Sequence, residues 1–126
     1  MSVRRYFYDS YAVLAYTSGH QAYREYFEER DGILTKLNLL EIFYRSLEQY
    51  DSKAALDILG SFYKYQVDFD EEDISASMSL RLELKRKGLD LSYADALGYF
   101  LSQKIGLKFL TGDRAFQGLK GVEYVV

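Results

Sequence analysis

The most regular hydrophobic pattern in the chain runs from Ser92 to Gly106. Apolar residues recur there at the spacing of one helical face, at Ala94, Leu97, Leu101 and Ile105. Ser92 is a favourable residue for the position before a helix, and Asp95 three residues later completes a capping box with it. Gly106 follows the last apolar position and is suited to end a helix. The pattern therefore predicts a helix that carries a carboxylate in its first turn.

A short apolar run follows this helix and leads to a second aspartate. Leu107 to Leu110 is typical of a largely covered strand, and Asp113 comes two residues after Thr111 at its carboxyl end. Open α/β sheets bind ligands at the carboxyl ends of their strands, so Asp95 and Asp113 are expected to face one crevice. Each aspartate also has an ordinary structural interpretation, because Asp commonly caps helices and forms turns.

The other hydrophobic and polar positions predict strands and helices in alternation. We expect strands at 3–8, 33–34, 66–69 and 122–126, and helices at 10–16, 21–30, 36–50, 53–65 and from the acidic residues 70–73 to the basic residues 85–87. Asp31-Gly32 is expected to form a turn, and Thr35 to cap the helix that follows. This alternation is typical of an α/β fold, with a mainly parallel sheet of about five strands flanked by helices.

The helix at 36–50 carries a third candidate carboxylate. Its core face is predicted to consist of Leu37, Leu40, Phe43, Tyr44 and Leu47. Glu41 lies beside this stripe, and a glutamate is costly to bury unless it is paired or bound to a cation. The pattern leaves open whether Glu41 is exposed at the edge of the stripe. The acidic residues 70–73 are expected to complement the positive end of their own helix, so they are left out of the site.

Composition limits the classes of protein that this chain can belong to. Its 126 residues, 48% of them hydrophobic, are expected to form a single domain, 1–126, with a substantial core. Cysteine is absent, which removes disulfides and thiolate metal sites and is compatible with the cytoplasm. No apolar run approaches the ~20 residues of a membrane span. The net charge of −3 counts mildly against nucleic-acid binding, although bound cations would offset an acidic metal pocket.

A fourth carboxylate, Asp9, follows the first predicted strand directly. Together with Glu41, Asp95 and Asp113 it makes a set of oxygen ligands with no cysteine and a single histidine, His20, in the chain. Such a set suits hard cations such as Mg²⁺ or Mn²⁺. If the side chains converge, they repel one another without a cation, and a bound cation would stabilise them.

The segments around these four residues resemble those of PIN-domain ribonucleases, most closely the VapC-type toxins. The matching segments are YDSYAVLA around Asp9, TKLNLLE ending at Glu41, YADAL around Asp95 and FLTGDRAF around Asp113. They occur in the family's order, and the resemblance covers essentially the whole chain. It implies a PIN-like three-layer sandwich and metal-dependent hydrolysis of phosphodiester bonds, usually in RNA. The chain has no obvious basic stripe outside these segments, which leaves the substrate open.

The resemblance also implies roles for individual residues. Asp9, Asp95 and Asp113 would be metal ligands, and Glu41 would be a direct ligand, a water-mediated ligand or a base. The small hydroxyl residues of the family correspond to Ser10 and Thr111, which would orient water or a carboxylate.

The partners that the resemblance implies are a second copy of the chain, in a homodimer, and an antitoxin whose segment covers the acidic groove. An RNA-maturation nuclease with the same site remains an alternative, as does a non-catalytic PIN-like domain that binds RNA or protein.

Other classes of enzyme fit the sequence less well. The single His20 excludes paired-histidine ribonuclease chemistry within one chain, and no G-x-S-x-G, P-loop or G-x-G-x-x-G motif is present. A haloacid-dehalogenase-like phosphatase would need a second aspartate where Tyr11 stands. A receiver-type domain would need an acidic pair near the first strand, which is not evident.

Overall fold

The computed structural model describes residues 5–126 and contains a parallel sheet with helices on both faces. The strands are β1 (Arg5–Tyr8), β2 (Asp31–Ile33), β3 (Lys108–Thr111) and β4 (Val122–Tyr124). Their order across the sheet is β2-β1-β3-β4, and all three pairings are parallel. The predicted α/β class and parallel sheet are therefore confirmed. The first strand was expected to begin at Val3, which lies outside the described residues.

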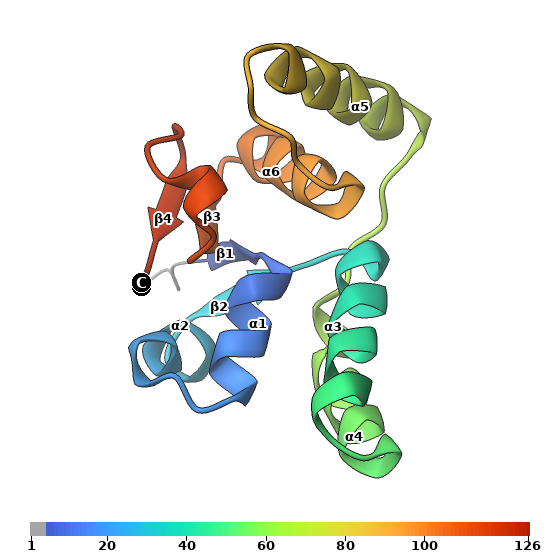
Figure 1. The fold of residues 1–126 in the computed structure, drawn as a ribbon, viewed down its shortest axis with the longest axis vertical. Helices are drawn as coiled ribbons and strands as arrows, with labels where there is room; N and C mark the ends of the chain where they lie inside the picture. The colour runs from blue at the N-terminus through green and yellow to red at the C-terminus, as the bar shows by residue number, and fades with distance from the viewer. Residues whose placement is uncertain (1–4) are drawn as a thin grey trace.

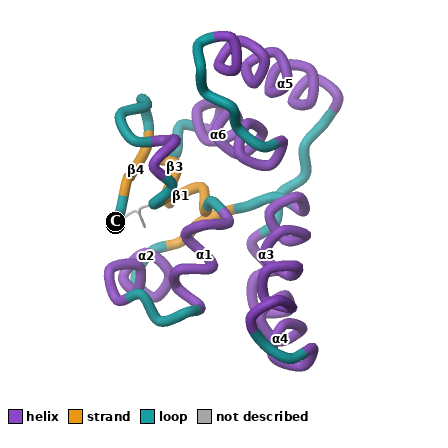
Figure 2. The backbone as a smooth tube through the Cα atoms, in the orientation of Figure 1, coloured by secondary structure: helices purple, strands orange, loops and turns teal. Residues whose placement is uncertain are grey.

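Six α-helices connect and cover these strands (Figures 1 and 2). They are α1 (Ser10–Thr17), α2 (Arg24–Glu28), α3 (Lys36–Gln49), α4 (Ser52–Phe62), α5 (Glu71–Arg86) and α6 (Tyr93–Ile105). In Figure 1, α1 and α2 lie on one side of the sheet, α5 and α6 lie on the other, and α3 and α4 form a separate antiparallel pair. None of these helices, which all fall between residues 5 and 126, is long and apolar enough to cross a membrane.

Alternation along β1 divides the core into two halves. Successive residues of a strand point to opposite faces of its sheet. Tyr6 and Tyr8 accordingly pack with α1 and α3 residues in one cluster, which includes Val13 and Ile42, and both tyrosines are almost fully buried. Phe7 packs on the other face, where it stacks on Phe109 at 5.7 Å between ring centres. The central strand is therefore covered on both sides, which holds its carboxyl end in a fixed position.

The sheet has four strands within the described residues, so the prediction of about five was too high. The run from Gln66 to Phe69 contributes only an isolated bridge between Gln66 and Leu34. The chain then continues to Asp70, which caps α5, and this leaves no length for further pairing. The predicted turn at Asp31-Gly32 is also wrong, because both residues belong to β2. Gly32 fits there because a Cβ would collide with the ring of Tyr8.

Two predicted helices are shorter than expected because each includes a 3₁₀ turn. The segment predicted as a helix at 21–30 consists of a 3₁₀ turn, Gln21–Tyr23, followed by the short α2. The helix predicted to run to Tyr65 ends as α4 at Phe62 and continues as the 3₁₀ turn Tyr63–Tyr65. A third 3₁₀ turn, Arg114–Phe116, follows β3. These boundaries affect the periphery of the fold and leave the element order unchanged.

The predicted core face of α3 is wrong at Leu40, Tyr44 and Leu47, which are exposed, whereas Leu37 packs against a core cluster as expected. The buried residues of α3 are Asn38, Leu39, Ile42 and Ser46. Leu40 and Tyr44, which were expected in the core, are 68% and 60% exposed. The reason is that the polar side chain of Asn38 is satisfied inside the protein by Thr35 and Ser10, so a polar position faces inwards.

The acidic start of α5 is structural, as the sequence predicts. Asp70 and Asp73 form a reciprocal capping box, and basic residues occupy the last turn. Asp73 also accepts a 2.7 Å hydrogen bond from the Lys104 ammonium of α6. This pair links α5 to α6.

Candidate active site

Asp9 lies at the carboxyl end of β1, in the position directly before α1, and its side chain makes no capping hydrogen bond to that helix. Its backbone amide donates to the carbonyl of Leu110 in β3, so the sheet fixes the backbone at this point. The residue is only 2% exposed. Oδ2 of its carboxylate accepts a 2.6 Å hydrogen bond from the Thr111 hydroxyl. The central strand therefore places a buried carboxylate at the end of the sheet where the strands have their carboxyl ends, as the sequence predicts.

Asp113 follows β3 and is tied to the same hydroxyl. The amide of Asp113 donates to Oγ1 of Thr111 at 3.0 Å, and Oδ1 of Asp113 accepts from the amide of Ala115 at 3.0 Å. Thr111 thus connects Asp9 to the turn that carries Asp113. Gly112 allows this turn to approach the rest of the protein, because a Cβ there would lie 2.5 Å from the carbonyl oxygen of Val125.

Asp95 occupies the first turn of α6 and forms the predicted capping box. Its amide donates to Oγ of Ser92 at 3.0 Å, and the amide of Ser92 donates to Oδ2 of Asp95 at 3.3 Å. Burial raises the pKa of Asp95 above its ordinary value, the hydrogen bonds to Ser92 oppose that rise, and the charges of Glu41 and Asp113 add to it. Asp95 therefore caps α6, and its pKa also depends on the charges of two other candidate carboxylates, Glu41 and Asp113.

Glu41 is partly buried on α3 and faces the same region. Its charge contributes to the raised pKa of Asp9 and to that of Asp95. Among residues 5–126, no Lys, Arg or His forms an ion pair with Glu41 or with any of the three candidate aspartates. Of the two interpretations left open by the sequence, the position of Glu41 favours the one in which it points to the site.

Asn38 is a buried residue of this region that sequence reasoning missed. Its amide donates to Oγ of Ser10 at 3.0 Å, while its carbonyl oxygen accepts from the amide and the hydroxyl of Thr35. Ser10 follows Asp9 directly, so Asn38 connects the start of α1 to the start of α3. The available signal was the spacing of Thr35 and Asn38, which matches that of a capping pair.

Burial and electrostatic repulsion both act on this cluster, and burial has the larger effect on the pKa of Asp9 and of Asp95. Burial raises the pKa of Asp9 well above its ordinary value, and the charges of Asp95, Glu41 and Asp113 raise it further, against the lowering effect of the Thr111 hydrogen bond. Asp9 therefore lies within range of the charges of the other three carboxylates, and Asp95 within range of those of Glu41 and Asp113. Such a cluster favours the binding of cations, because a cation offsets both the burial of charge and the mutual repulsion.

The donor atoms suit a cation that keeps part of its water shell. Within residues 5–126, no three carboxylate or imidazole groups converge closely enough to hold one metal ion directly. Mg²⁺ usually retains several waters and is bound through one or two carboxylates, with substrate phosphates as further ligands. Oxygen donors without thiolates and with fewer than three direct ligands therefore fit Mg²⁺ or Mn²⁺ better than Zn²⁺, which prefers nitrogen and sulfur donors in a closed tetrahedral site.

The chain is similar to known proteins in its three-dimensional structure. No protein-family model matches the chain, and no curated protein matches it significantly. A chain of a toxin–antitoxin complex from Klebsiella pneumoniae is 20% identical, with a TM-score of 0.70, over 94% of this chain and 95% of its own length.

Two further structures are VapBC proteins bound to DNA. VapBC2 from Rickettsia felis, bound to a DNA fragment from its promoter, has a TM-score of 0.73 at 17% identity, over 96% of this chain and 97% of that chain. DNA-bound VapBC from Salmonella typhimurium has a TM-score of 0.73 at 19% identity, over 98% of both chains. At these identities the likeness concerns the fold. The resemblance to VapC-type PIN-domain proteins that the motifs indicate is thus confirmed in the fold of this chain.

Proposed function

We propose that the chain is a divalent-metal-dependent ribonuclease that hydrolyses RNA phosphodiester bonds and is the toxin of a VapBC-type toxin–antitoxin pair. The observation that carries this proposal is the position of Asp9. Its buried carboxylate lies within charge range of Asp95, Glu41 and Asp113, at the carboxyl edge of a parallel sheet. Open α/β sheets bind ligands at this edge, and clustered carboxylates are typical of sites that process phosphodiesters with hard cations.

Each residue of the cluster would have a distinct role in holding the cation or orienting its ligands. Asp9, Asp95 and Asp113 would hold Mg²⁺ or Mn²⁺, one or two of them directly and the rest through waters that the cation retains, and Glu41 would be a direct ligand, a water-mediated ligand or a base. A divalent cation bound there lowers the pKa of a water molecule and offsets charge on the phosphate. Thr111 fixes the orientation of Asp9 relative to Asp113, because its hydroxyl bonds both residues.

Ser10 has a comparable orienting position on the other side of Asp9. Its hydroxyl accepts from the Asn38 amide and retains its own proton for a second hydrogen bond. Ser10 is buried beside Asp9, so this proton is available to a water or a carboxylate in the cluster. The Thr111 hydroxyl bonds the Asp9 carboxylate from β3, and the Ser10 hydroxyl lies at the start of α1, on the residue after Asp9.

The protein partner in this proposal is an antitoxin that covers the acidic cluster. The names of the similar structures, which are toxin–antitoxin or VapBC complexes, support it. We further propose that two copies of the chain form a homodimer. An exposed apolar stripe on α3, formed by Leu40, Tyr44 and Leu47, supplies a surface suited to such an association.

Cleavage of single-stranded RNA by the purified chain tests this function. We expect cleavage in Mg²⁺ or Mn²⁺ and none in excess EDTA. A titration with Mn²⁺ in the absence of RNA separates the nuclease from a non-catalytic PIN-like domain, since only the nuclease requires the cation. Undiminished cleavage in EDTA, or no cleavage of any RNA in the presence of Mn²⁺, contradicts the proposal.

A further inference from the structure

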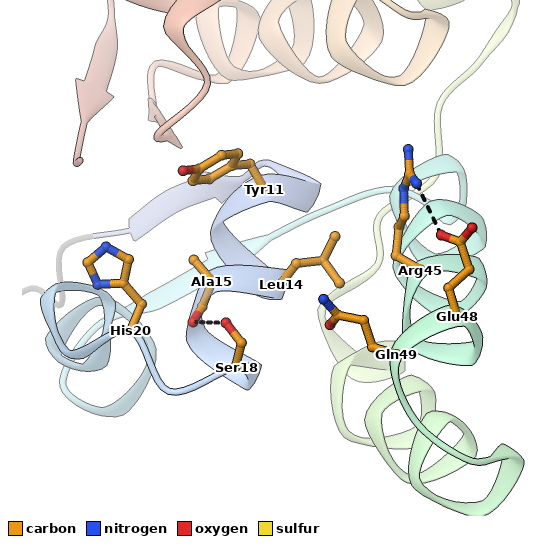
Figure 3. A pocket seen from close by; sticks show the side chains of 8 residues that line it. All are labelled: Tyr11, Leu14, Ala15, Ser18, His20, Arg45, Glu48 and Gln49. Atoms are coloured by element: carbon orange, nitrogen blue, oxygen red, sulfur yellow. Dashed lines mark hydrogen bonds and ion pairs between the residues drawn. The ribbon is translucent and has the colours of Figure 1, made fainter.

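A pocket of about 390 Å³ lies along α1, between α3 and the loop that carries His20. Figure 3 shows the residues that line it, with Leu14 and Gln49 pointing into the space between the two helices and His20 on the far side of α1. Its lining includes Tyr11 and Leu14 from α1, Ser18 directly after α1, and Arg45, Glu48 and Gln49 from α3. We call this cavity the Tyr11 pocket.

One residue on each wall of the Tyr11 pocket lies close along the chain to a residue of the carboxylate cluster. Tyr11 lies two residues after Asp9, and its ring packs over the turn at Gly112, where a Cβ would lie 2.5 Å from Cε1 of Tyr11. On the opposite wall, Arg45 lies four residues after Glu41 on α3, so the two side chains are neighbours on one helix face. Tyr11 and Arg45 therefore connect the pocket to the turn that carries Asp113 and to the helix that carries Glu41.

The chemistry of the lining suits a nucleotide. The ring centres of Tyr11 and the buried Tyr23 lie 6.4 Å apart. Tyr11 itself is 44% exposed, so its ring is accessible to a ligand in the pocket. Leu14 points into the space between the helices, and the amide of Gln49 lies opposite it (Figure 3). An exposed aromatic ring, an apolar floor and an amide supply stacking and hydrogen bonding for a base.

Arg45 adds a cation that can take up a phosphate. Its guanidinium forms a 3.0 Å ion pair with Glu48, and both side chains are about half exposed, at 59% and 46%. Exposed ion pairs of this kind contribute little to stability, so exchange of Glu48 for a phosphate costs little. A phosphate also takes two parallel hydrogen bonds from a guanidinium. The negative charge of Glu48 nevertheless opposes any anion in the pocket.

We propose that the Tyr11 pocket binds one nucleotide of a single-stranded RNA substrate, next to the phosphodiester that is cleaved. The base stacks on Tyr11, and the adjoining phosphate binds Arg45. This inference rests on the proposed ribonuclease function and assigns part of its substrate contact. It predicts that the chain prefers unpaired RNA, because a base within a duplex cannot reach the ring.

Binding of a labelled single-stranded RNA to Asp9→Asn protein tests the role of Tyr11, since this background is expected to bind without cleaving. Fluorescence anisotropy then measures affinity directly. Tyr11→Leu keeps the apolar bulk over Gly112 but removes the aromatic face, and we expect about tenfold weaker binding. Tyr11→Phe should bind like the parent. Tyr63→Leu, at an exposed tyrosine of the 3₁₀ turn after α4, is the matched control and should also bind like the parent.

The role of Arg45 is tested by the salt dependence of the same binding. If Arg45 contacts a phosphate, Arg45→Gln should reduce the slope of log affinity against log salt by about 0.7. Glu48→Gln removes the opposing charge and should tighten binding. A purely structural role for Arg45 would leave the slope unchanged.

The outcomes separate this inference from the proposed function. If Tyr11→Leu binds RNA as tightly as Tyr11→Phe, or if Arg45→Gln leaves the salt slope unchanged, the pocket does not hold a nucleotide, while cleavage by the wild-type protein still supports the ribonuclease. If Tyr11→Leu loses only its association with an antitoxin, the occupant is a protein segment and the inference is overturned. If the wild-type protein neither binds nor cleaves RNA, the function and the pocket fail together.

Discussion

The hydroxyl of Thr111 donates a 2.6 Å hydrogen bond to Oδ2 of Asp9. Both side chains are buried, and they stand at the carboxyl ends of the neighbouring strands β3 and β1. The same hydroxyl oxygen accepts from the amide of Asp113, so one side chain sets the relative position of two candidate carboxylates. Removing this hydroxyl should therefore affect both the stability of the protein and its activity.

Replacement of Thr111 by valine tests this link, because valine keeps the shape and removes the hydroxyl. A hydrogen bond to a charged group contributes about 1.5–3 kcal/mol, so we expect the free energy of unfolding to fall by about 2 kcal/mol. RNA cleavage should fall about 10- to 100-fold, as for other groups that orient metal ligands. Thr111→Ser retains the hydroxyl and is the control. Equal activity of the valine and serine variants would show that the hydroxyl has no orienting role.

Two glycines within helices should respond to alanine in opposite directions. A Cβ on Gly98 in α6 would lie 2.6 Å from Cε1 of Phe7, so Gly98→Ala should overpack the core and cost about 1–3 kcal/mol, partly offset by better helix propensity. A Cβ on Gly60 in α4 meets nothing within 4 Å, so Gly60→Ala should stabilise the protein by about 0.4–1 kcal/mol. Urea unfolding measures both. A stabilising Gly98→Ala would mean that α6 lies farther from the sheet than described.

The pair of Asp73 and Lys104 predicts a dependence of stability on pH. The hydrogen bond from Lys104 lowers the pKa of Asp73 below its ordinary value, with a smaller contribution from the amide of Asp70. Because the folded-state pKa is the lower one, the stabilisation is complete above the unfolded-state pKa of about 4 and is lost as the pH falls through the folded-state value. Asp73→Asn should therefore lower the melting temperature at neutral pH, and the difference should shrink below about pH 4.

The exposed aspartate Asp68 supplies the control for this prediction. Asp68→Asn, on the segment that precedes α5, should leave the melting temperature nearly unchanged across the same range of pH. A difference between Asp73→Asn and the parent that persists undiminished in acid would assign the effect to packing and not to charge.

The apolar stripe on α3 should govern self-association. Leu40, Tyr44 and Leu47 are exposed and recur at helical spacing, which places them on one face. Light scattering should give the mass of two chains for the wild-type protein and of one chain for the double variant Leu40→Glu, Tyr44→Glu. Leu82→Glu, on an exposed position of α5, is the control and should remain a dimer. A wild-type protein that is monomeric over a broad range of concentration would contradict the homodimer.

Features set by local chemistry could be predicted from the sequence. Ser92 and Asp95 form the capping box that their spacing indicates, and Gly106 ends α6 with a φ of 84°, which glycine adopts without strain. The carboxylates Asp9 and Asp113 follow the strands that were expected to carry them, because the hydrophobic runs before them define those strands. The chemistry of a single segment was enough in each case.

Features set by distant contacts could not be predicted in this way. The buried face of α3 is decided by Asn38, whose amide is satisfied only once Ser10 of another helix lies beside it. Without that contact, a stripe of leucine and tyrosine is the better candidate for the core. The run from Gln66 to Phe69 has residues typical of a strand. Its pairing is nevertheless limited to the bridge between Gln66 and Leu34, because the chain leads directly to the start of α5 at Asp70. The Tyr11 pocket likewise requires two helices to be placed together.

The central claim is that Asp95 holds a cation and does not only cap α6. The comparison of Asp95→Asn with Ser92→Ala tests it, because both changes affect the capping box and only the first removes a carboxylate charge. Ser92→Ala should cost about 1 kcal/mol of stability and leave metal binding intact. For Asp95→Asn we expect little loss of stability without metal, because repulsion within the cluster is relieved.

The decisive measurement is calorimetric titration of both variants with Mn²⁺, together with their rates of RNA cleavage. The account predicts that Asp95→Asn binds Mn²⁺ much more weakly than the wild-type protein and cleaves RNA more than about 100-fold more slowly, a larger effect than that of groups which merely orient ligands. Ser92→Ala should keep both properties near the wild-type values. If Asp95→Asn binds Mn²⁺ and cleaves RNA like the wild-type protein, Asp95 is only a helix cap and the proposed metal site is wrong.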